Sequence, residues 1–166
     1  FYCKQFTADY IHDFSCTHRM DILDYKNVVY YSSSPCIFPS ENGYKMNIRL
    51  VNYKIYPDGS YTIKDFVSTT NKLIELDKQF NKVGDEKIFT DLGHSRRPNG
   101  WNYNLHGVED IRIAERFGKL IFTGTICNNK NKISMGMGEY KNKAPIQELE
   151  MLSSCEKNWV LIPGRD

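Results

Sequence analysis

An acidic pair followed by an arginine is the part of this 166-residue sequence best suited to chemistry. Glu109 and Asp110 are carboxylates, and Arg112 lies two residues beyond Asp110. Because residues two apart in a β-strand share a face, a strand here would place Asp110 beside Arg112, with Ile111 and Ile113 opposite. A positioned carboxyl can transfer a proton, and a guanidinium can bind an oxyanion. The same spacing is also typical of an ordinary surface ion pair, which is the commoner case on spacing alone.

Two other segments carry polar side chains of the same kind. Asn47 and Arg49 lie two apart in the alternating run Tyr44–Tyr56, so they share a face. Lys157 and Asn158 lie in the later run EKNW. The planar fork of an arginine suits oxyanions, and a lysine supplies a point charge. The alternative for Arg49 is a strand-face charge paired with a neighbouring carboxylate.

A polar stretch between these segments mixes arginines with aromatic rings. Arg96, Arg97, Trp101 and Tyr103 lie within the run HSRRPNGWNYN. Aromatic faces stack on sugar rings and arginines bind anions, so this stretch is a candidate sugar-stacking or anion-binding loop. A solvated basic loop with one anchored Trp is an equally good interpretation.

The elements that would position these side chains are β-hairpins. Ile111 and Ile113 alternate before a turn that ends at Gly118, and Leu120 and Phe122 alternate after it, which is typical of a hairpin. Further turns are predicted at Ser40–Gly43, Pro57–Gly59 and Asn128–Asn131. Since no long run has a helical period, the predicted fold class is all-β.

The hairpins share a repeated plan in the sequence. The runs SSSPCIFPSENGYKMNIRLVNYKI and GVEDIRIAERFGKLIFTGTICNN share one plan, and SCEKNWVLIPG is similar to the start of another copy. Four-stranded units of about 40–50 residues are typical of β-propellers, although a sandwich or barrel also fits evenly spaced strands. We expect a single incomplete β-propeller domain with about two to three blades. Its predicted parts are a leading segment (1–32), a first blade (33–80), an insertion loop (81–104), a second blade (105–153) and the start of a third (154–166).

The run VEDIRIAERFGKLIFTGT resembles a hairpin of the five-bladed β-propeller glycosidases and phosphorylases, especially glycoside hydrolase family 130, the mannoside phosphorylases. In that family the acidic pair is followed by Pro and Arg, whereas Ile111 stands in place of the Pro here. MNIRLVNY and EKNW resemble two other segments of the family, in the same order, so the resemblance covers roughly residues 33–162. The chain is also similar to propeller domains of large DNA viruses, some of them fused to glycosyltransferase-like regions.

This resemblance implies a five-bladed ring and gives the candidate residues their roles. Asp110 matches the proton donor to the glycosidic oxygen. Phosphate or sugar binding would fall to Arg49, Asn47, Glu109, Arg112, Lys157 and Asn158. The implied activity is hydrolysis or phosphorolysis of mannose-type glycosides by single displacement, with inorganic phosphate as the co-substrate of a phosphorylase and no other cofactor. The replacement of Pro by Ile favours a non-catalytic glycan-binding or interaction propeller instead, so whether the chain is an enzyme stays open.

The charge and cysteine content limit the classes of binding partner that the sequence predicts. The formal net charge is +2 and charged residues make up 25% of the chain, which indicates neither nucleic acid nor an anionic membrane as a partner. Carbohydrate is the expected partner, together with a fused or associated glycosyltransferase implied by the viral resemblance. The five cysteines include no CxxC pair, so we expect no metal site. No signal peptide is visible, and we expect a cytoplasmic location.

Overall fold

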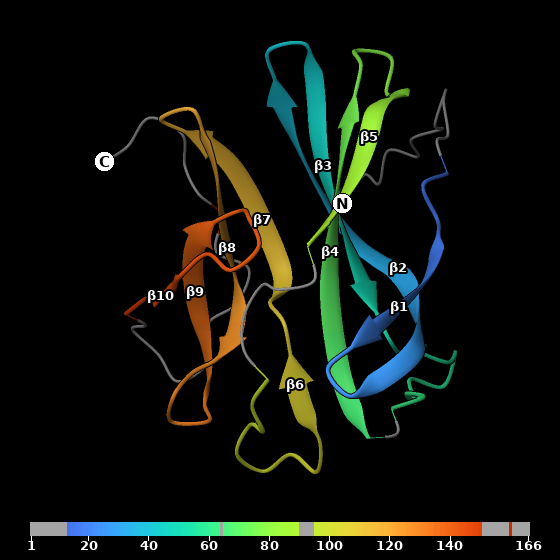
Figure 1. Cartoon of the computed structure of the whole chain (residues 1–166), viewed down its shortest axis with the longest axis vertical. Coiled ribbons are helices and arrows are strands. Elements are labelled where there is room, and N and C mark those ends of the chain that lie inside the picture. Colours follow the sequence, from blue (N-terminus) through green and yellow to red (C-terminus); the bar gives the residue numbers. More distant parts are fainter. Residues whose placement is uncertain (1–12, 64, 90–94, 151–159, 161–166) are drawn as a thin grey trace, which may run out of the picture.

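The structure is a computed structural model that describes residues 13–63, 65–89, 95–150 and 160 (Figure 1). The regular elements of this part are β-strands, so the predicted all-β class is confirmed. The described residues form two largely antiparallel sheets, the first curled into a half-barrel, and no propeller is detected in them. They contain no helix long and apolar enough to cross a membrane.

The first sheet is a meander in which strand β4 is covered on both faces. Its strands are β1 (Thr17–Ile22), β2 (Tyr25–Ser40), β3 (Gly43–Val51), β4 (Phe66–Leu76) and β5 (Lys82–Phe89), and β6 (Asn104–His106) pairs in parallel with the start of β4. All but one residue of β4 is buried, as expected for a strand with neighbours on both edges and both faces. The outer strand β5 is mostly exposed and rich in charge, which discourages pairing with another chain.

The second sheet is a four-stranded antiparallel meander. It consists of β7 (Glu109–Arg116), β8 (Lys119–Cys127), β9 (Ile133–Glu139) and β10 (Ile146–Glu148). The predicted hairpin is confirmed, because Ile113 lies opposite Phe122 across β7 and β8. Its turn has positive φ angles at both Phe117 (52°) and Gly118 (69°), the backbone that a two-residue hairpin requires.

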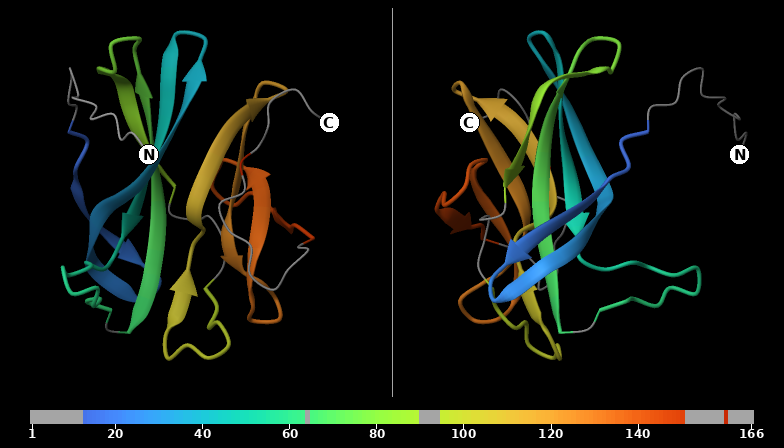
Figure 2. Two further views of the ribbon diagram at one scale, coloured as in Figure 1. Left: turned by 180° about the vertical axis from the view of Figure 1, so that it is seen from behind. Right: turned by 45° about the vertical axis from the view of Figure 1, so that its right-hand side comes forward.

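Alternate residues of β3 separate two cores. Met46, Ile48 and Leu50 point into the concave side of the half-barrel, where they pack with Tyr30 and Phe66. The opposite face meets the second sheet, so that β7 lies against β2 and β3. Both views in Figure 2 show the second sheet on one side of β3 and β4, while β1 curls round the other side.

The core between the sheets is apolar at one end. Leu73 of β4 packs there with Val108, Ile111, Ile113 and Phe122. These side chains come from both sheets, so the interface is a continuous core and not a surface contact. The polar part of the interface lies beside this core and contains the predicted site residues.

The strands do not follow two of the expected divisions of the chain. Residue 33 was expected to begin a blade, but it lies inside β2, which runs without a break from Tyr25 to Ser40. The run SSSP bends this strand, since its register with β3 shifts between Ser32 and Pro35. The predicted insertion loop over 81–104 contains β5. This strand is exposed and charged at the edge of the sheet, so its sequence resembles that of a polar loop. The predicted start of a third blade lies outside the described residues, apart from Val160.

Candidate functional site

The start of β7 is held close to β8 by glycines. Gly107 has a φ of 89°, which favours glycine. A Cβ atom on Gly124 of β8 would lie 2.5 Å from a Val108 methyl group and 2.9 Å from the Glu109 carbonyl oxygen. Because Gly124 has no side chain, the segment carrying the acidic pair can cross directly above it.

A β-bulge at Asp110 breaks the expected alternation. Glu109 pairs with Thr125 and Arg112 pairs with Thr123, so β7 has one extra residue between these pairs, and Asp110 has a φ of 52°. Its carboxylate therefore lies on the side that meets the first sheet, next to buried Ile111. The prediction that Asp110 and Arg112 share a face, with Ile111 opposite, assumed a regular strand and is wrong for this reason.

Arg49 is hydrogen bonded to both carboxylates of the acidic pair, although they lie about 60 residues away in sequence. Its Nη1 atom donates a hydrogen bond of 2.8 Å to Asp110 Oδ1, and its Nη2 atom donates to Glu109 Oε1. Nη2 also lies 3.2 Å from the Tyr53 hydroxyl and 3.4 Å from Thr69 Oγ1. We call these five residues the Arg49 cluster.

Burial and charge limit what the Arg49 cluster can bind. The side chain of Arg49 is 8% exposed, that of Glu109 16% and that of Asp110 28%, so Asp110 is the most exposed of the three charged residues. The cluster carries one positive and two negative formal charges, an unfavourable setting for a further anion. Burial is the main cause that raises the pKa of Tyr53, so this phenol stays neutral and can hydrogen bond to a neutral ligand.

Asn47 belongs to a second, fully internal network. Its Nδ2 atom donates to Asn71 Oδ1 at 3.1 Å, and its Oδ1 atom accepts from the Tyr140 hydroxyl of the second sheet. Asn71 in turn donates to the Val108 carbonyl oxygen at 3.3 Å. Both amide side chains have no measurable exposure. Asn47 therefore links the two sheets, and no face of it is open to a ligand.

The other predicted residues around the acidic pair are not brought into the Arg49 cluster. Arg112 is partly buried and donates from Nη1 to the carbonyl oxygen of Ile111 at 3.3 Å. Lys157 and Asn158 lie outside the described residues. The structure thus brings together Arg49, Glu109 and Asp110 and places Asn47 next to them on the same face of β3.

The candidate loop Arg96–Tyr103 is fastened to the second sheet. Arg96 donates to Asn129 Oδ1 at 2.7 Å, and Arg97 Nε donates to the Trp101 carbonyl oxygen at 2.8 Å. Trp101 and Tyr103 are partly buried, and their ring centroids lie 5.1 Å apart. Both rings pack against a small core of Val67, Leu105 and Cys127. These contacts favour the interpretation of an anchored loop over a free stacking surface.

Sequence reasoning missed the partners that complete these networks. Tyr53, Thr69, Asn71 and Tyr140 come from three segments with no motif of their own. Two of them, Thr69 and Asn71, lie on β4, the strand adjacent to β3, where Asn71 lies opposite Arg49. Pairing these two strands in sequence would have placed both residues beside Arg49.

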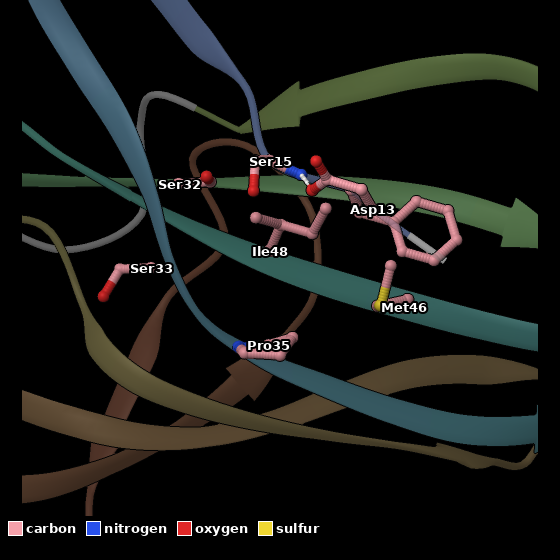
Figure 3. A pocket seen from close by; sticks show the side chains of 8 residues that line it. Asp13, Ser15, Ser32, Ser33, Pro35, Met46 and Ile48 are labelled. Carbon is pink, nitrogen blue, oxygen red and sulfur yellow. Dashed lines mark hydrogen bonds between the residues drawn. The ribbon is translucent and has the colours of Figure 1, made fainter. Parts of the chain in front are cut away.

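A cavity of about 350 Å³ on the concave side was also missed. Figure 3 shows Met46 and Ile48 of β3 facing it, with Ser15, Ser32 and the carboxylate of Asp13 at its rim. Met46 and Ile48 point away from Arg49, since residues of opposite parity on a strand face opposite sides. This cavity and the Arg49 cluster therefore cannot share one ligand.

Among the described residues, no group of three or more His, Cys, Asp or Glu side chains could hold a metal ion. Comparisons with models of protein families, with curated proteins and with solved structures found no match for this chain.

Proposed function

We propose that this chain recognises a carbohydrate without cleaving it, through Asp110 and Tyr53 at the open side of the Arg49 cluster. One observation carries the proposal: both carboxylates of the acidic pair are held by the same buried guanidinium. A carboxylate held in this way is a fixed hydrogen-bond acceptor, which suits sugar hydroxyl groups.

The same observation weighs against phosphorolysis. A phosphorylase would need Arg49 to bind phosphate, but its two terminal nitrogens already donate to carboxylates. Phosphate would have to displace Glu109 or Asp110 from the buried guanidinium, which is costly because both carboxylates are themselves partly buried. Binding of a neutral sugar needs no such displacement.

The resemblance to propeller glycosidases supplies the choice of carbohydrate. Arg49 and Asp110 were singled out from separate motifs, and they are in direct contact. We extend the proposal to the fold: the second sheet, a four-stranded antiparallel meander, would be one blade of an incomplete propeller, and the first sheet would be the preceding blade. A fused or associated glycosyltransferase and a cytoplasmic location belong to the same proposal.

Glycoside cleavage is the second candidate, and the backbone at Asp110 favours it. A non-glycine residue with a φ of 52° in a bulge is an uncommon conformation, and such strain is concentrated at functional sites. In this alternative Asp110 would donate a proton to the glycosidic oxygen through the carboxylate oxygen that does not bind Arg49. A hydrolase would also need a second carboxylate as base, roughly 6.5–9.5 Å from the first for inversion.

The test combines binding and turnover in one set of variants. Calorimetry with mannose-type oligosaccharides, release of reducing sugar, and formation of sugar 1-phosphate when phosphate is added are measured for the unaltered chain, for Asp110→Asn and for the exposed control Asp85→Asn. We expect binding without turnover, weakened at least about tenfold by Asp110→Asn and unchanged in the control. Turnover that falls about 10²–10⁴-fold in Asp110→Asn would establish the second candidate. Absence of binding by the unaltered chain overturns both.

A further inference from the structure

A groove at the end of the first sheet has the features of a separate ligand site. After β3 the chain leaves the sheet and forms an arm over residues 52–63 that extends away from both sheets (Figure 2, right). The groove between this arm and β2 has a volume of about 480 Å³, within the roughly 300–1,000 Å³ typical of small-ligand pockets. Its polar lining comes from Tyr31, Asn52, Lys54, Tyr56, Thr62 and Asp65.

The arm is hydrogen bonded into a fixed shape. Its two sides are joined by Tyr56 N to Ser60 O at 2.9 Å and by Thr62 N to Lys54 O at 3.0 Å. Asn52 fastens its root, since its side chain donates to the Phe66 carbonyl oxygen and accepts from Ser68 N. A ligand that binds such a preformed wall does not have to order it first.

The two tyrosines of the groove differ in what covers them. Lys54 Nζ lies 4.6 Å from the centroid of the Tyr31 ring, so this ring is already part of a cation–π contact. The side chain of Tyr56 is 51% exposed. An exposed aromatic side chain at the edge of a polar groove can stack on the apolar face of a sugar ring.

The charges in the groove balance. Lys54 and Asp65 contribute one charge of each sign, and the other polar groups are hydroxyls and an amide. A balanced groove favours a neutral, hydroxyl-rich ligand over a polyanion, because an anion would meet Asp65 as well as Lys54. We infer that the groove binds a neutral oligosaccharide, with one sugar ring stacked on Tyr56 and hydrogen bonded by Lys54 and Asp65.

This site is distinct from the Arg49 cluster. None of the residues that line the groove belongs to that cluster, and Tyr53, the cluster residue nearest in sequence, makes its aromatic contact with Tyr61 at 5.6 Å. The inference depends on the proposed function only for the choice of sugars as probes. Each site can therefore fail without the other.

The experiment uses a matched pair of tyrosines on the same arm. Tyr56 lines the groove, whereas Tyr61 is equally exposed, at 54%, and is not among the residues that line it. Binding of neutral trisaccharides of mannose, glucose, galactose and N-acetylglucosamine is followed by NMR for the unaltered chain, Tyr56→Ala, Tyr61→Ala and Asp110→Asn. Heparin-derived trisaccharide serves as the anionic probe.

We expect at least one neutral trisaccharide to bind, with affinity lowered about tenfold or more by Tyr56→Ala and unchanged by Tyr61→Ala. If binding is retained in Asp110→Asn, the trisaccharide binds in the groove and not at the Arg49 cluster. This result would support the groove even if no probe binds at the cluster. Equal loss in both tyrosine variants, preference for the anionic probe, loss confined to Asp110→Asn, or no binding to any trisaccharide would overturn the inference.

Discussion

The two faces of β3 hold the protein together in different ways. One face carries Met46, Ile48 and Leu50 into the concave core of the half-barrel, where contacts are apolar and non-directional. The other carries Asn47 and Arg49 to the second sheet, where each is held by named hydrogen bonds. Both faces are buried, although their chemistry is opposite.

The difference shows what fixes the position of the second sheet. An apolar face tolerates small shifts, because dispersion and burial depend weakly on direction. A buried guanidinium or amide is costly unless its partners lie at hydrogen-bond distance. The polar face therefore selects one arrangement of β7 on β3, and its removal should cost more than an equally small change on the apolar face.

The largest effect is expected from Arg49→Ala. This change leaves Glu109 and Asp110 without their shared cation in a poorly solvated interface, and breaking one partner of a buried pair costs about 3–5 kcal/mol. Because Asp110 is partly exposed, we expect the lower half of that range. Urea unfolding followed by tyrosine fluorescence measures the change in the free energy of unfolding.

The control variant is Ile48→Val. Ile48 is the neighbour of Arg49 in β3 and lies on the opposite face of the strand. Loss of one buried methylene group there should cost about 0.5–1.5 kcal/mol. If Arg49→Ala proved no more destabilising than Ile48→Val, the polar face would not be what fixes the second sheet. A triple change of Arg49→Met, Glu109→Gln and Asp110→Asn should recover part of the loss, since it leaves no charge in the Arg49 cluster.

A smaller effect is expected from Tyr140→Phe. The change removes the hydroxyl that donates to Asn47 and leaves a buried amide oxygen unsatisfied, which costs about 1–3 kcal/mol. Burial also raises the pKa of Tyr140 above its ordinary value of 10.0. Its contribution to stability is therefore fully present below about pH 10 and is lost as the pH rises further, because the unfolded chain ionises first.

Denaturant titrations at about pH 8 and about pH 11 test both parts of this prediction. Tyr140→Phe should be less stable than the unaltered chain at the lower pH, and the gap should narrow at the higher pH. Tyr30 also has a raised pKa from burial, so some alkaline sensitivity should remain in the variant. An equal gap at both pH values would contradict the burial of the Tyr140 phenol.

Period-two alternation made part of this structure predictable from the sequence. It assigned Asn47 and Arg49 to one face of β3 and Met46 and Ile48 to the other, as the structure shows. The hairpin around Gly118 followed from turn chemistry in the same way. Local rules of this kind hold where the backbone is regular.

Alternation failed where the backbone gains a residue. A bulge leaves no mark in the sequence pattern, and the one at Asp110 turned its carboxylate toward Arg49. The partnership with Tyr140, 93 residues from Asn47, depends on how two sheets meet, which no local pattern encodes. The expected start of a blade at residue 33 falls in the run SSSP, which lies within β2 where the register with β3 shifts.

The smallest effect is expected from Glu148→Gln. Glu148 is a hydrogen-bonded carboxylate like those of the Arg49 cluster, but it lies at an exposed edge of the second sheet. Glu148 on β10 accepts hydrogen bonds from Asn128 at 2.7 Å and Ser134 at 2.8 Å, and these lower its pKa below the ordinary value of 4.5. The stability it adds is present above pH 4.5 and is lost as the pH falls through its lowered pKa.

Since the side chain is exposed, water replaces the lost partners, and Tm at pH 7 should fall by only about 1 °C. Calorimetric scans at pH 7 and at about pH 3 should show that gap closing at the acid end. A loss as large as that of Arg49→Ala would mean that exposure does not separate the two carboxylate sites, and that burial is the wrong explanation for the strength of the Arg49 cluster.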